Sequence, residues 1–185
     1  MAKRAFDIIA ALGGLIVLSP VLAAVAIAVR LDSPGPALHW SRRVGRGNAL
    51  FAMPKFRTMR TGAPDVATHL LPHPERWITP LGRFLRRTSL DELPQLWSVL
   101  RGDMSLVGPR PLPLRDVERI DVRWHRRRFS VKPGITCLWQ IRSRTPEFDA
   151  WIRSDMEYID NWSLTLDLKI LAKTLPAVLS RQNAY

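Results

Sequence analysis

The feature that most constrains this chain is an almost wholly apolar run from Phe6 to Val29. The run has about 24 residues, which as a straight helix would be roughly 36 Å long. The hydrocarbon core of a bilayer is about 30 Å thick. On length alone, the run therefore predicts a helix that can cross a membrane.

Three arrangements of this run compete. Lys3 and Arg4 before it, with small residues late in it, resemble a signal peptide, although the length of the run counts against that interpretation. Ser19-Pro20 lies near its centre, and serine followed by proline is typical of an N-cap and the first position of a new helix. Each arm would then have about 13 residues, or roughly 20 Å, which is too short to cross. A signal peptide, a straight span and a helical hairpin all remain open.

Basic residues flank both ends of the run. Lys3 and Arg4 precede it, and Arg30 with a strongly basic region follows it. Because basic flanks prefer the cytoplasmic side, a helical hairpin keeps both flanks there, whereas a straight span must translocate one. The backbone carbonyl groups freed at Pro20 would need Ser19, water or neighbouring helices as partners.

Composition limits the remaining chemistry. The chain has 185 residues, 46% of them hydrophobic, enough for one domain with a core beyond the apolar run. Its formal net charge of +12 predicts an anionic partner, either nucleic acid, an anionic membrane face or a phosphorylated substrate. One cysteine excludes internal disulfides, and the four scattered histidines form no zinc-binding pattern.

The rest of the chain predicts an α+β, mostly helical domain. Residues 32–36 have turn chemistry, 37–59 favour short extended segments, and 61–76 form a polar loop that is the best candidate for a mobile element. Residues 77–87 have an amphipathic pattern, typical either of a helix in the membrane interface or of a surface helix docked on the core, and 164–179 are similar. Seven tryptophans fit an aromatic belt at a membrane surface.

The candidate reactive group is the pair Asp91 and Glu92. Ser89 followed three residues later by Glu92 has the spacing of a capping box, which would place both carboxylates in the first turn of a helix, where the macrodipole favours their ionised form. An ionised carboxylate is a usable nucleophile, and the arginine-rich setting suits chemistry on a phosphate. Alternatively, Asp91 is itself the N-cap with Pro94 at the third helical position, and is then not a reagent.

Short motifs follow one another in order along nearly the whole chain. They are Lys3-Arg4-Ala5-Phe6-Asp7, Ser19-Pro20, Pro34-Gly35-Pro36, Lys55-Phe56-Arg57-Thr58-Met59, Ser89-Leu90-Asp91-Glu92-Leu93-Pro94-Gln95, Arg101-Gly102-Asp103-Met104-Ser105-Leu106-Val107-Gly108-Pro109-Arg110-Pro111, Pro133-Gly134-Ile135-Thr136 and Asn161-Trp162-Ser163. Together they resemble the bacterial sugar transferases, also called monotopic phosphoglycosyl transferases, in their small catalytic-unit form.

The resemblance implies an arrangement and a reaction. It implies a re-entrant membrane anchor over residues 1–31, broken at Ser19-Pro20, and a catalytic domain over residues 32–185 that faces the cytoplasm at the bacterial inner membrane. It also implies transfer of a sugar 1-phosphate from a UDP-sugar to undecaprenyl phosphate, a Mg²⁺ requirement, and Asp91 as the nucleophile of a covalent intermediate. Such a reaction is the first membrane step of glycoconjugate assembly.

The chemistry assigns roles to the neighbouring charges. We expect Glu92 to help hold Mg²⁺ with Asp91 or to tune Asp91. Guanidinium and ammonium groups must offset the charge of the diphosphate, and Arg110, between two prolines, is the first choice for a bidentate phosphate contact. The next choices are Arg86, Lys55 and Arg57.

The chain also departs from the usual motifs. Cys137 follows Pro-Gly-Ile-Thr where many relatives have glycine, and Arg142-Ser143-Arg144 stands where Ser-Gly-Arg is usual, so these positions do not guide a choice of sugar. The runner-up interpretation is a membrane-anchored basic protein that binds anionic lipid or nucleic acid without turnover. The enzyme interpretation predicts no nucleic-acid partner, and the sequence leaves a homodimer open.

Overall fold

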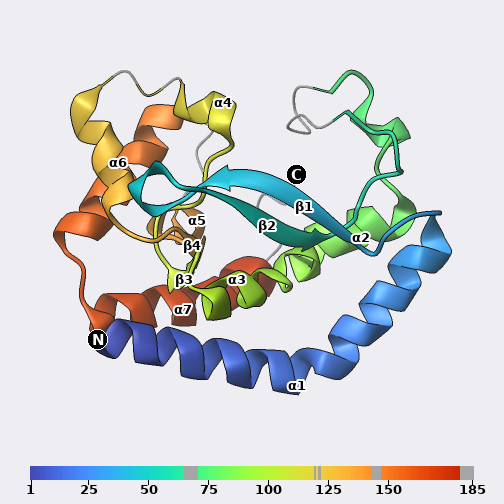
Figure 1. Cartoon of the computed structure of the whole chain (residues 1–185), viewed down its shortest axis with the longest axis horizontal. Coiled ribbons are helices and arrows are strands. Elements are labelled where there is room, and N and C mark those ends of the chain that lie inside the picture. The colour runs from blue at the N-terminus through green and yellow to red at the C-terminus, as the bar shows by residue number, and fades with distance from the viewer. Residues whose placement is uncertain (65–70, 119, 121, 143–146, 180–185) are drawn as a thin grey trace.

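A computed structural model describes residues 1–64, 71–118, 120, 122–142 and 147–179 of the chain. Within them the fold is α+β and mostly helical, as predicted (Figure 1). The α-helices are α1 (Ala2–Asp32), α2 (Pro80–Thr88), α3 (Gln95–Arg101), α4 (Leu114–Val117), α5 (Leu138–Ile141), α6 (Phe148–Asp160) and α7 (Leu164–Leu179). The strands are β1 (Leu38–Val44), β2 (Leu50–Phe56), β3 (Ser105–Val107) and β4 (Gly134–Thr136), and the 3₁₀ turns are η1 (Arg46–Asn48), η3 (Pro74–Arg76), η4 (Leu90–Glu92) and η5 (Arg123–Ser130).

Two small sheets hold the loops at the centre of the molecule in position. Strands β1 and β2 form an antiparallel hairpin over the region predicted to be extended. Strands β3 and β4 pair in parallel, and a Cβ atom on Gly134 would lie 2.1 Å from the backbone nitrogen of Gly108. Because nothing larger than glycine fits this approach, the loop after β3 is held tightly against the loop before β4.

The apolar N-terminal run forms one helix, α1, and this corrects the predicted break between two helices at Ser19-Pro20. Figure 1 shows α1 bent near its middle instead. Pro20 has no N–H for the carbonyl group of Ile16, and the hydroxyl of Ser19 donates to that oxygen at 2.8 Å. Ser19, one of the three partners that the sequence left open, therefore satisfies the carbonyl group that proline frees, and the helix continues through the bend.

The N-terminal turns of α1 are tied to the rest of the molecule by polar contacts. Lys3 Nζ lies 2.5 Å from Asp167 Oδ2 on α7, and the Arg4 guanidinium donates to the last carbonyl groups of α3, those of Val99 and Leu100. Buried Asp7 accepts hydrogen bonds from the Ser105 hydroxyl and the Leu106 N–H of β3. This end of the helix is thus fixed by polar contacts to three different elements, α7, α3 and β3.

The C-terminal end of α1 is fixed by Arg57, which follows β2. Its guanidinium donates to the carbonyl groups of Pro36 and Ser33, each at 2.7 Å, and to the Ser33 hydroxyl at 2.6 Å. A longer contact reaches the carbonyl group of Val29 in the last turn of α1. Both ends of the helix therefore contact the same globular body.

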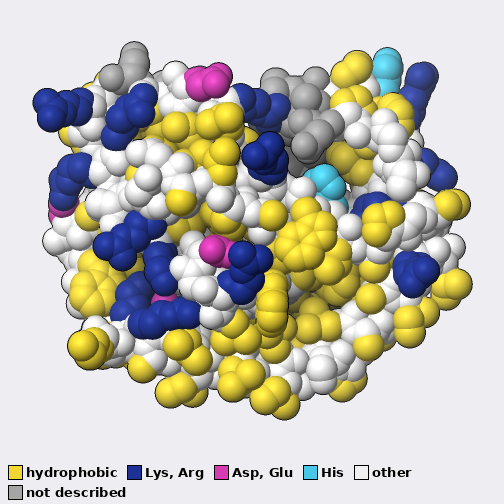
Figure 2. Space-filling view, viewed as in Figure 1, with side chains coloured by type: hydrophobic (Ala, Val, Ile, Leu, Met, Phe, Trp, Pro, Cys, Tyr) yellow, Lys and Arg dark blue, Asp and Glu magenta, His cyan; other side chains and the backbone are white. Residues whose placement is uncertain are grey.

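Between its ends, α1 exposes most of its apolar surface. Among the described residues it is the helix with the length and composition to cross a membrane, and 6% of its most hydrophobic window is buried. Ala11 joins the main core with Val99 and Val107, so the packing continues from the helix into the domain, and the division at residues 31 and 32 stays a prediction. Figure 2 shows hydrophobic side chains along the lower edge, over α1.

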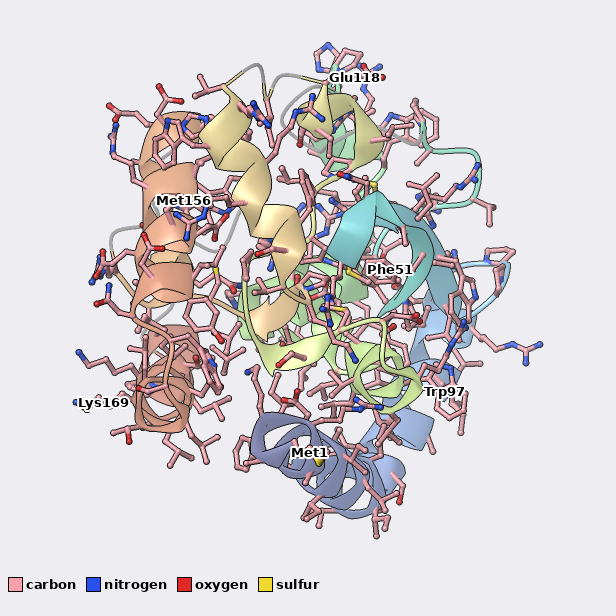
Figure 3. All side chains as sticks on the ribbon, turned by 60° about the vertical axis from the view of Figure 1, so that its left-hand side comes forward. Met1, Phe51, Trp97, Glu118, Met156 and Lys169 are labelled. Carbon is pink, nitrogen blue, oxygen red and sulfur yellow. The ribbon has the colours of Figure 1, made fainter. Side chains whose placement is uncertain are left out.

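Helix α2 lies against the C-terminal half of α1. It begins at Pro80 with the Thr79 hydroxyl capping Gly82, three residues later than predicted, because Trp77 and Ile78 belong to the preceding segment. Its apolar face packs with Val29 and Phe56 through Leu85, while Phe84 is exposed. Helix α7 spans the predicted residues 164–179. In Figure 3, Met1 and Trp97 lie toward the α1 end of the molecule and Glu118 lies at the opposite end.

The contacts of Arg57 generate a stability prediction. Arg57→Lys should lower the free energy of unfolding by about 2 kcal/mol, because one ammonium group cannot reach the three strong acceptors that the guanidinium serves. Thermal unfolding of the full chain in detergent measures this change. The matched control is Arg60→Lys, an exposed position three residues away, which should leave the unfolding temperature unchanged. Equal unfolding temperatures for the two variants would contradict a structural role for Arg57.

Candidate active site

The segment that carries Asp91 and Glu92 is a 3₁₀ turn between two helices. Helix α2 ends at Thr88, Ser89 adopts left-handed backbone angles with φ 56°, and its side chain makes no capping hydrogen bond. The predicted capping box is therefore wrong, because the Ser89 hydroxyl caps no N–H, although both carboxylates do lie in the first turn of η4. The alternative, with Asp91 as N-cap, is also wrong, because α3 starts only at Gln95 after Pro94. Neither carboxylate is used as a helix cap.

Glu92 is at the centre of a cluster of charges. Its Oε1 atom lies 2.7 Å from Lys55 Nζ on β2 and 2.7 Å from Arg110 Nη2, and its Oε2 atom lies 3.4 Å from Arg110 Nη1. Burial opposes the ionised form of Glu92, but the charges and hydrogen bonds of Arg110 and Lys55 more than offset it and hold the pKa well below its ordinary value. Glu92 is therefore ionised and joins two cations from distant segments.

Asp91 lies beside this cluster in a different state. It is 8% exposed, and no described residue donates a hydrogen bond to its carboxylate. Burial raises the pKa of Asp91 to about 6, and the like charge of Glu92 adds to the shift, while Lys55, Arg86 and Arg110 oppose it. The described residues therefore leave the Asp91 carboxylate without a hydrogen-bond donor, next to Glu92, which binds two cations.

Arg86 approaches Asp91 from α2. Its Nε atom donates to the Thr58 hydroxyl at 2.8 Å, and its charge is among those that act on Asp91. The position of α2 is set by Gly82, since a Cβ atom there would lie 2.1 Å from the carbonyl oxygen of Thr58. This close approach brings the last turn of α2 to the carboxylate pair.

The backbone of Arg110 is held from behind by a buried ion pair. Arg128 Nη2 donates to the carbonyl group of Arg110 at 2.7 Å and lies 2.8 Å from Asp155 Oδ2 on α6. Arg128 and Asp155 are almost fully buried, and the Arg128 guanidinium also lies over the ring of Trp151. Sequence reasoning missed this support, because nothing local marks one arginine in the run Arg126-Arg127-Arg128 as buried.

Four of the five predicted cationic and acidic neighbours of Asp91 are thus brought together: Glu92, Lys55, Arg86 and Arg110. Arg57 is not. Its guanidinium is engaged at the end of α1, so its placement does not fit the predicted phosphate contact. Ser19 and Pro20 lie on α1 and serve the bend described above.

Two further side chains that sequence reasoning missed line a hollow next to Arg110. They are Arg43 on β1 and Gln95 at the start of α3, and the other lining residues are Met53 and Pro111. Gln95 belongs to the motif around Asp91, and this membership was the only feature of the sequence that could have indicated a role for it. Arg43 follows Arg42 in a basic strand, and the alternation of strand side chains could have separated the two.

The structure describes two of the residues that depart from the usual motifs, Cys137 and Arg142. Cys137 is buried, and burial raises the pKa of its thiol to about 12, so it is not a reactive thiolate. Arg142 makes a two-pronged contact with Glu157 on the surface, with both N to O distances at 2.6 Å. The neighbouring Ser143 and Arg144 lie outside the described residues.

The arrangement favours binding of a multiply charged anion. Lys55, Arg86 and Arg110 bring three positive charges to two carboxylates, and one of these, Asp91, accepts no hydrogen bond from the described residues. A phosphate or diphosphate bound here would meet a potential nucleophile directly. The geometry therefore suits displacement at a phosphorus atom.

Comparison with known proteins agrees with this chemistry. The family described as bacterial sugar transferase matches residues 1–181. The chain is 41% identical to the undecaprenyl-phosphate galactose phosphotransferase of Salmonella typhimurium over 99% of this chain and 41% of that protein. It is 42% identical to the UDP-glucose:undecaprenyl-phosphate glucose-1-phosphate transferase of Caulobacter vibrioides over 100% of this chain and 72% of that protein.

A third relative is the exopolysaccharide production protein ExoY of Rhizobium meliloti, 37% identical over 100% of this chain and 88% of that protein. The chain spans about two fifths of the length of the longer relatives, the Salmonella protein among them. The matched region nevertheless includes every residue of the charge cluster.

The charge cluster predicts an unusual titration. The carboxyl carbon of Asp91, followed by ¹³C NMR, should titrate with a pKa of about 6 instead of the ordinary value of 3.8. Glu92→Gln should lower that midpoint, because it removes the like charge and also leaves Lys55 and Arg110 without their counter-ion. Arg86→Gln should raise it, since a positive charge that favours the ionised form is lost.

Glu118→Gln, which removes an exposed acid, is the control and should leave the midpoint unchanged. A wild-type midpoint near 4, or identical midpoints in the three variants, would contradict the electrostatic description of the cluster.

Proposed function

The chain belongs to the bacterial sugar transferase family, and from that membership we propose that it transfers a sugar 1-phosphate from a UDP-sugar to undecaprenyl phosphate, releasing UMP. The name of the Caulobacter relative describes such a transfer, with glucose as the sugar. The observation that carries the proposal is Asp91, a carboxylate without a described hydrogen-bond donor beside phosphate-binding cations. A basic lipid-binding protein would need the charge and the anchor, but it would not need this free carboxylate.

In the first step, an oxygen of ionised Asp91 attacks the phosphorus that bears the sugar. The bond from that phosphorus to the bridging oxygen breaks, and UMP leaves with the bonding electron pair. In the second step, an oxygen of undecaprenyl phosphate attacks the same phosphorus, and the Asp91 carboxylate leaves. One phosphoanhydride is lost and one is formed, so no nucleoside triphosphate is needed.

The neighbouring side chains bind and orient the diphosphate. Arg110 presents a planar guanidinium that suits two phosphate oxygens, and its backbone is held by Arg128. Lys55 and Arg86 add positive charge from β2 and α2. Glu92 keeps Lys55 and Arg110 in place before the substrate arrives, because it contacts both.

The residues present fit a Mg²⁺ ion that arrives with the diphosphate. Among the described residues, no three His, Cys, Asp or Glu side chains gather into a self-sufficient metal site. Mg²⁺ typically binds one or two carboxylates and completes its shell with phosphate oxygens and water. We expect Asp91 and the less engaged Oε2 of Glu92 to hold it, and its charge would offset the charge that builds on the diphosphate.

We propose that α1 is a re-entrant anchor in the bacterial inner membrane, with the domain on the cytoplasmic side. Contacts at both ends of α1 support this proposal. Lys3, Arg4 and Asp7 bind the domain at the N-terminal end of the helix, and Arg57 binds the C-terminal end. A straight span would have to break one of these sets of contacts. Exposed Phe84 and Trp97 lie on helices that pack against α1, which suits the interfacial depth of a lipid phosphate.

We propose that the transfer is the first membrane step of polysaccharide assembly. The name of the Rhizobium relative, an exopolysaccharide production protein, supports a role in polysaccharide synthesis. The names of the Salmonella and Caulobacter relatives specify galactose and glucose. A panel of UDP-sugars, assayed for UMP release with and without undecaprenyl phosphate, identifies the sugar for this chain.

The assignment of Asp91 as the nucleophile predicts that its replacement abolishes activity. Asp91→Asn should reduce UMP release by at least about 10³-fold and abolish the phosphosugar adduct that mass spectrometry detects when lipid phosphate is withheld. Glu92→Gln should leave at least a trace of adduct. Asp160→Asn, an exposed aspartate paired with Arg127, is the matched control and should keep wild-type turnover. Robust turnover by Asp91→Asn would remove the assignment.

The anchor arrangement predicts protection of the N-terminus. In a background with Cys137 replaced by alanine, Ala2→Cys should resist an impermeant thiol reagent in intact cells and react after permeabilisation. Replacing Ser19 and Pro20 with leucine restores the missing backbone donor, so a straight helix of roughly 36 Å becomes available and the cysteine should become reactive from outside.

Val17→Leu, an exposed apolar change one turn earlier, is the control and should leave the cysteine protected. Labelling from outside in the variant that retains Ser19 and Pro20 would mean that the helix spans the membrane.

A further inference from the structure

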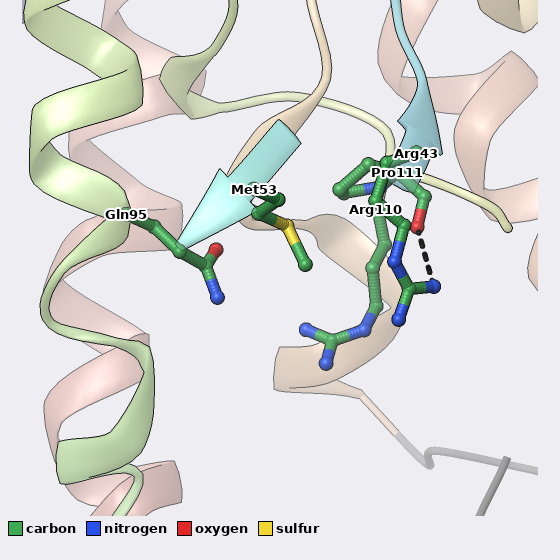
Figure 4. Close-up of a pocket in the computed structure, with 5 residues that line it drawn as sticks. All are labelled: Arg43, Met53, Gln95, Arg110 and Pro111. Atoms are coloured by element: carbon green, nitrogen blue, oxygen red, sulfur yellow. Dashed lines mark hydrogen bonds between the residues drawn. The ribbon is translucent and has the colours of Figure 1, made fainter. Parts of the chain in front are cut away.

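A small hollow lies next to Arg110 and is separate from the carboxylate pair. Its volume is about 10 Å³, which is room for about one water-sized group. Arg43, Met53, Gln95, Arg110 and Pro111 line it, and neither Asp91 nor Glu92 does. Figure 4 shows the guanidinium groups of Arg43 and Arg110 near each other and the amide of Gln95 on the other side of Met53.

Gln95 supplies a buried donor to this hollow. The residue is 2% exposed, and its amide nitrogen has no hydrogen-bond partner among the described residues. A buried donor without a partner costs free energy, so its retention indicates an acceptor that arrives from outside. Gln95 is also the first residue of α3, directly after the turn that carries Asp91, which fixes it close to the reacting groups.

Arg43 supplies a half-buried charge. Its Nε atom donates to the Ser41 hydroxyl at 3.0 Å, and its Nη1 atom reaches the Pro111 carbonyl oxygen only at 3.5 Å. Burial, followed by the neighbouring charge of Arg110, lowers the pKa of Arg43 to about 10. No described carboxylate forms an ion pair with Arg43, so an anion between the two guanidinium groups would relieve their repulsion.

We propose that Arg43, Gln95 and Arg110 form a second oxyanion subsite, which binds an oxygen of a phosphate group other than the one that Asp91 attacks. Because Asp91 does not line the hollow, the attacked phosphorus lies outside it. The inference rests on the proposed function, in which two such phosphates exist: the phosphate that leaves as part of UMP, and the phosphate of the incoming lipid. Both present the same chemistry, a phosphoryl oxygen that accepts hydrogen bonds.

The test measures binding without turnover. The full chain in nanodiscs is titrated calorimetrically with UMP, and separately with undecaprenyl phosphate. Arg43→Gln should weaken one of the two by about tenfold, equivalent to about 1.4 kcal/mol. Weaker UMP binding assigns the subsite to the nucleotide phosphate, and weaker lipid binding assigns it to the acceptor.

A second variant keeps the test informative if Arg43→Gln does not fold. Gln95→Met has nearly the same volume and lacks the donor, so it should bind the same ligand more weakly while its unfolding temperature stays equal to that of the wild type or rises. The matched control is Arg42→Gln on the opposite face of β1, which removes an equal charge at an exposed position and should leave both affinities unchanged.

The subsite is overturned if the wild type binds UMP or the lipid phosphate and both Arg43→Gln and Gln95→Met bind them within twofold of it. In that case the hollow holds water only. A failure of the proposed function looks different, because there the wild type shows no UMP release from any UDP-sugar while the calorimetric comparison of variants can still be made.

Discussion

The ion cluster around Glu92 is the interaction on which the candidate site depends. One carboxylate joins Lys55 of β2 to Arg110 of the loop after β3, and Glu92 itself lies on the turn between α2 and α3. Three segments that are distant in sequence therefore meet at a single group. Because Glu92 binds Lys55 and Arg110, the adjacent Asp91 keeps a carboxylate to which no described residue donates a hydrogen bond. The same geometry both holds the cations and leaves the nucleophile available.

Much of the fold could be predicted where the signal is local. The apolar run that forms α1 and the bounds of α7 follow from the residues within one or two helical turns, whereas the continuity of α1 through Ser19-Pro20 does not. The association of Asp91 with Lys55, Arg86 and Arg110 came from the ordered motifs, not from any spacing rule. Those motifs identified a set of residues but gave no contacts between them.

The wrong predictions have physical causes that a sequence does not display. Lys55 and Arg57 are two residues apart and would share a face of a strand, but β2 ends at Phe56, so Lys55 reaches Glu92 while Arg57 turns to the end of α1. The Ser89 spacing matches a capping box, yet its left-handed backbone ends α2 and its side chain makes no capping bond to η4. Each error reflects a chain direction set by tertiary packing.

The contact between Lys3 and Asp167 has a consequence for how the chain is made. The two residues are 164 positions apart, so the first turn of α1 has no ion-pair partner until almost all of the described chain has been synthesised. Contacts of such long range form late, because the intervening chain must be ordered first. The first turn of the apolar helix therefore lacks this ion pair for most of translation, and the contact closes only when α7 docks.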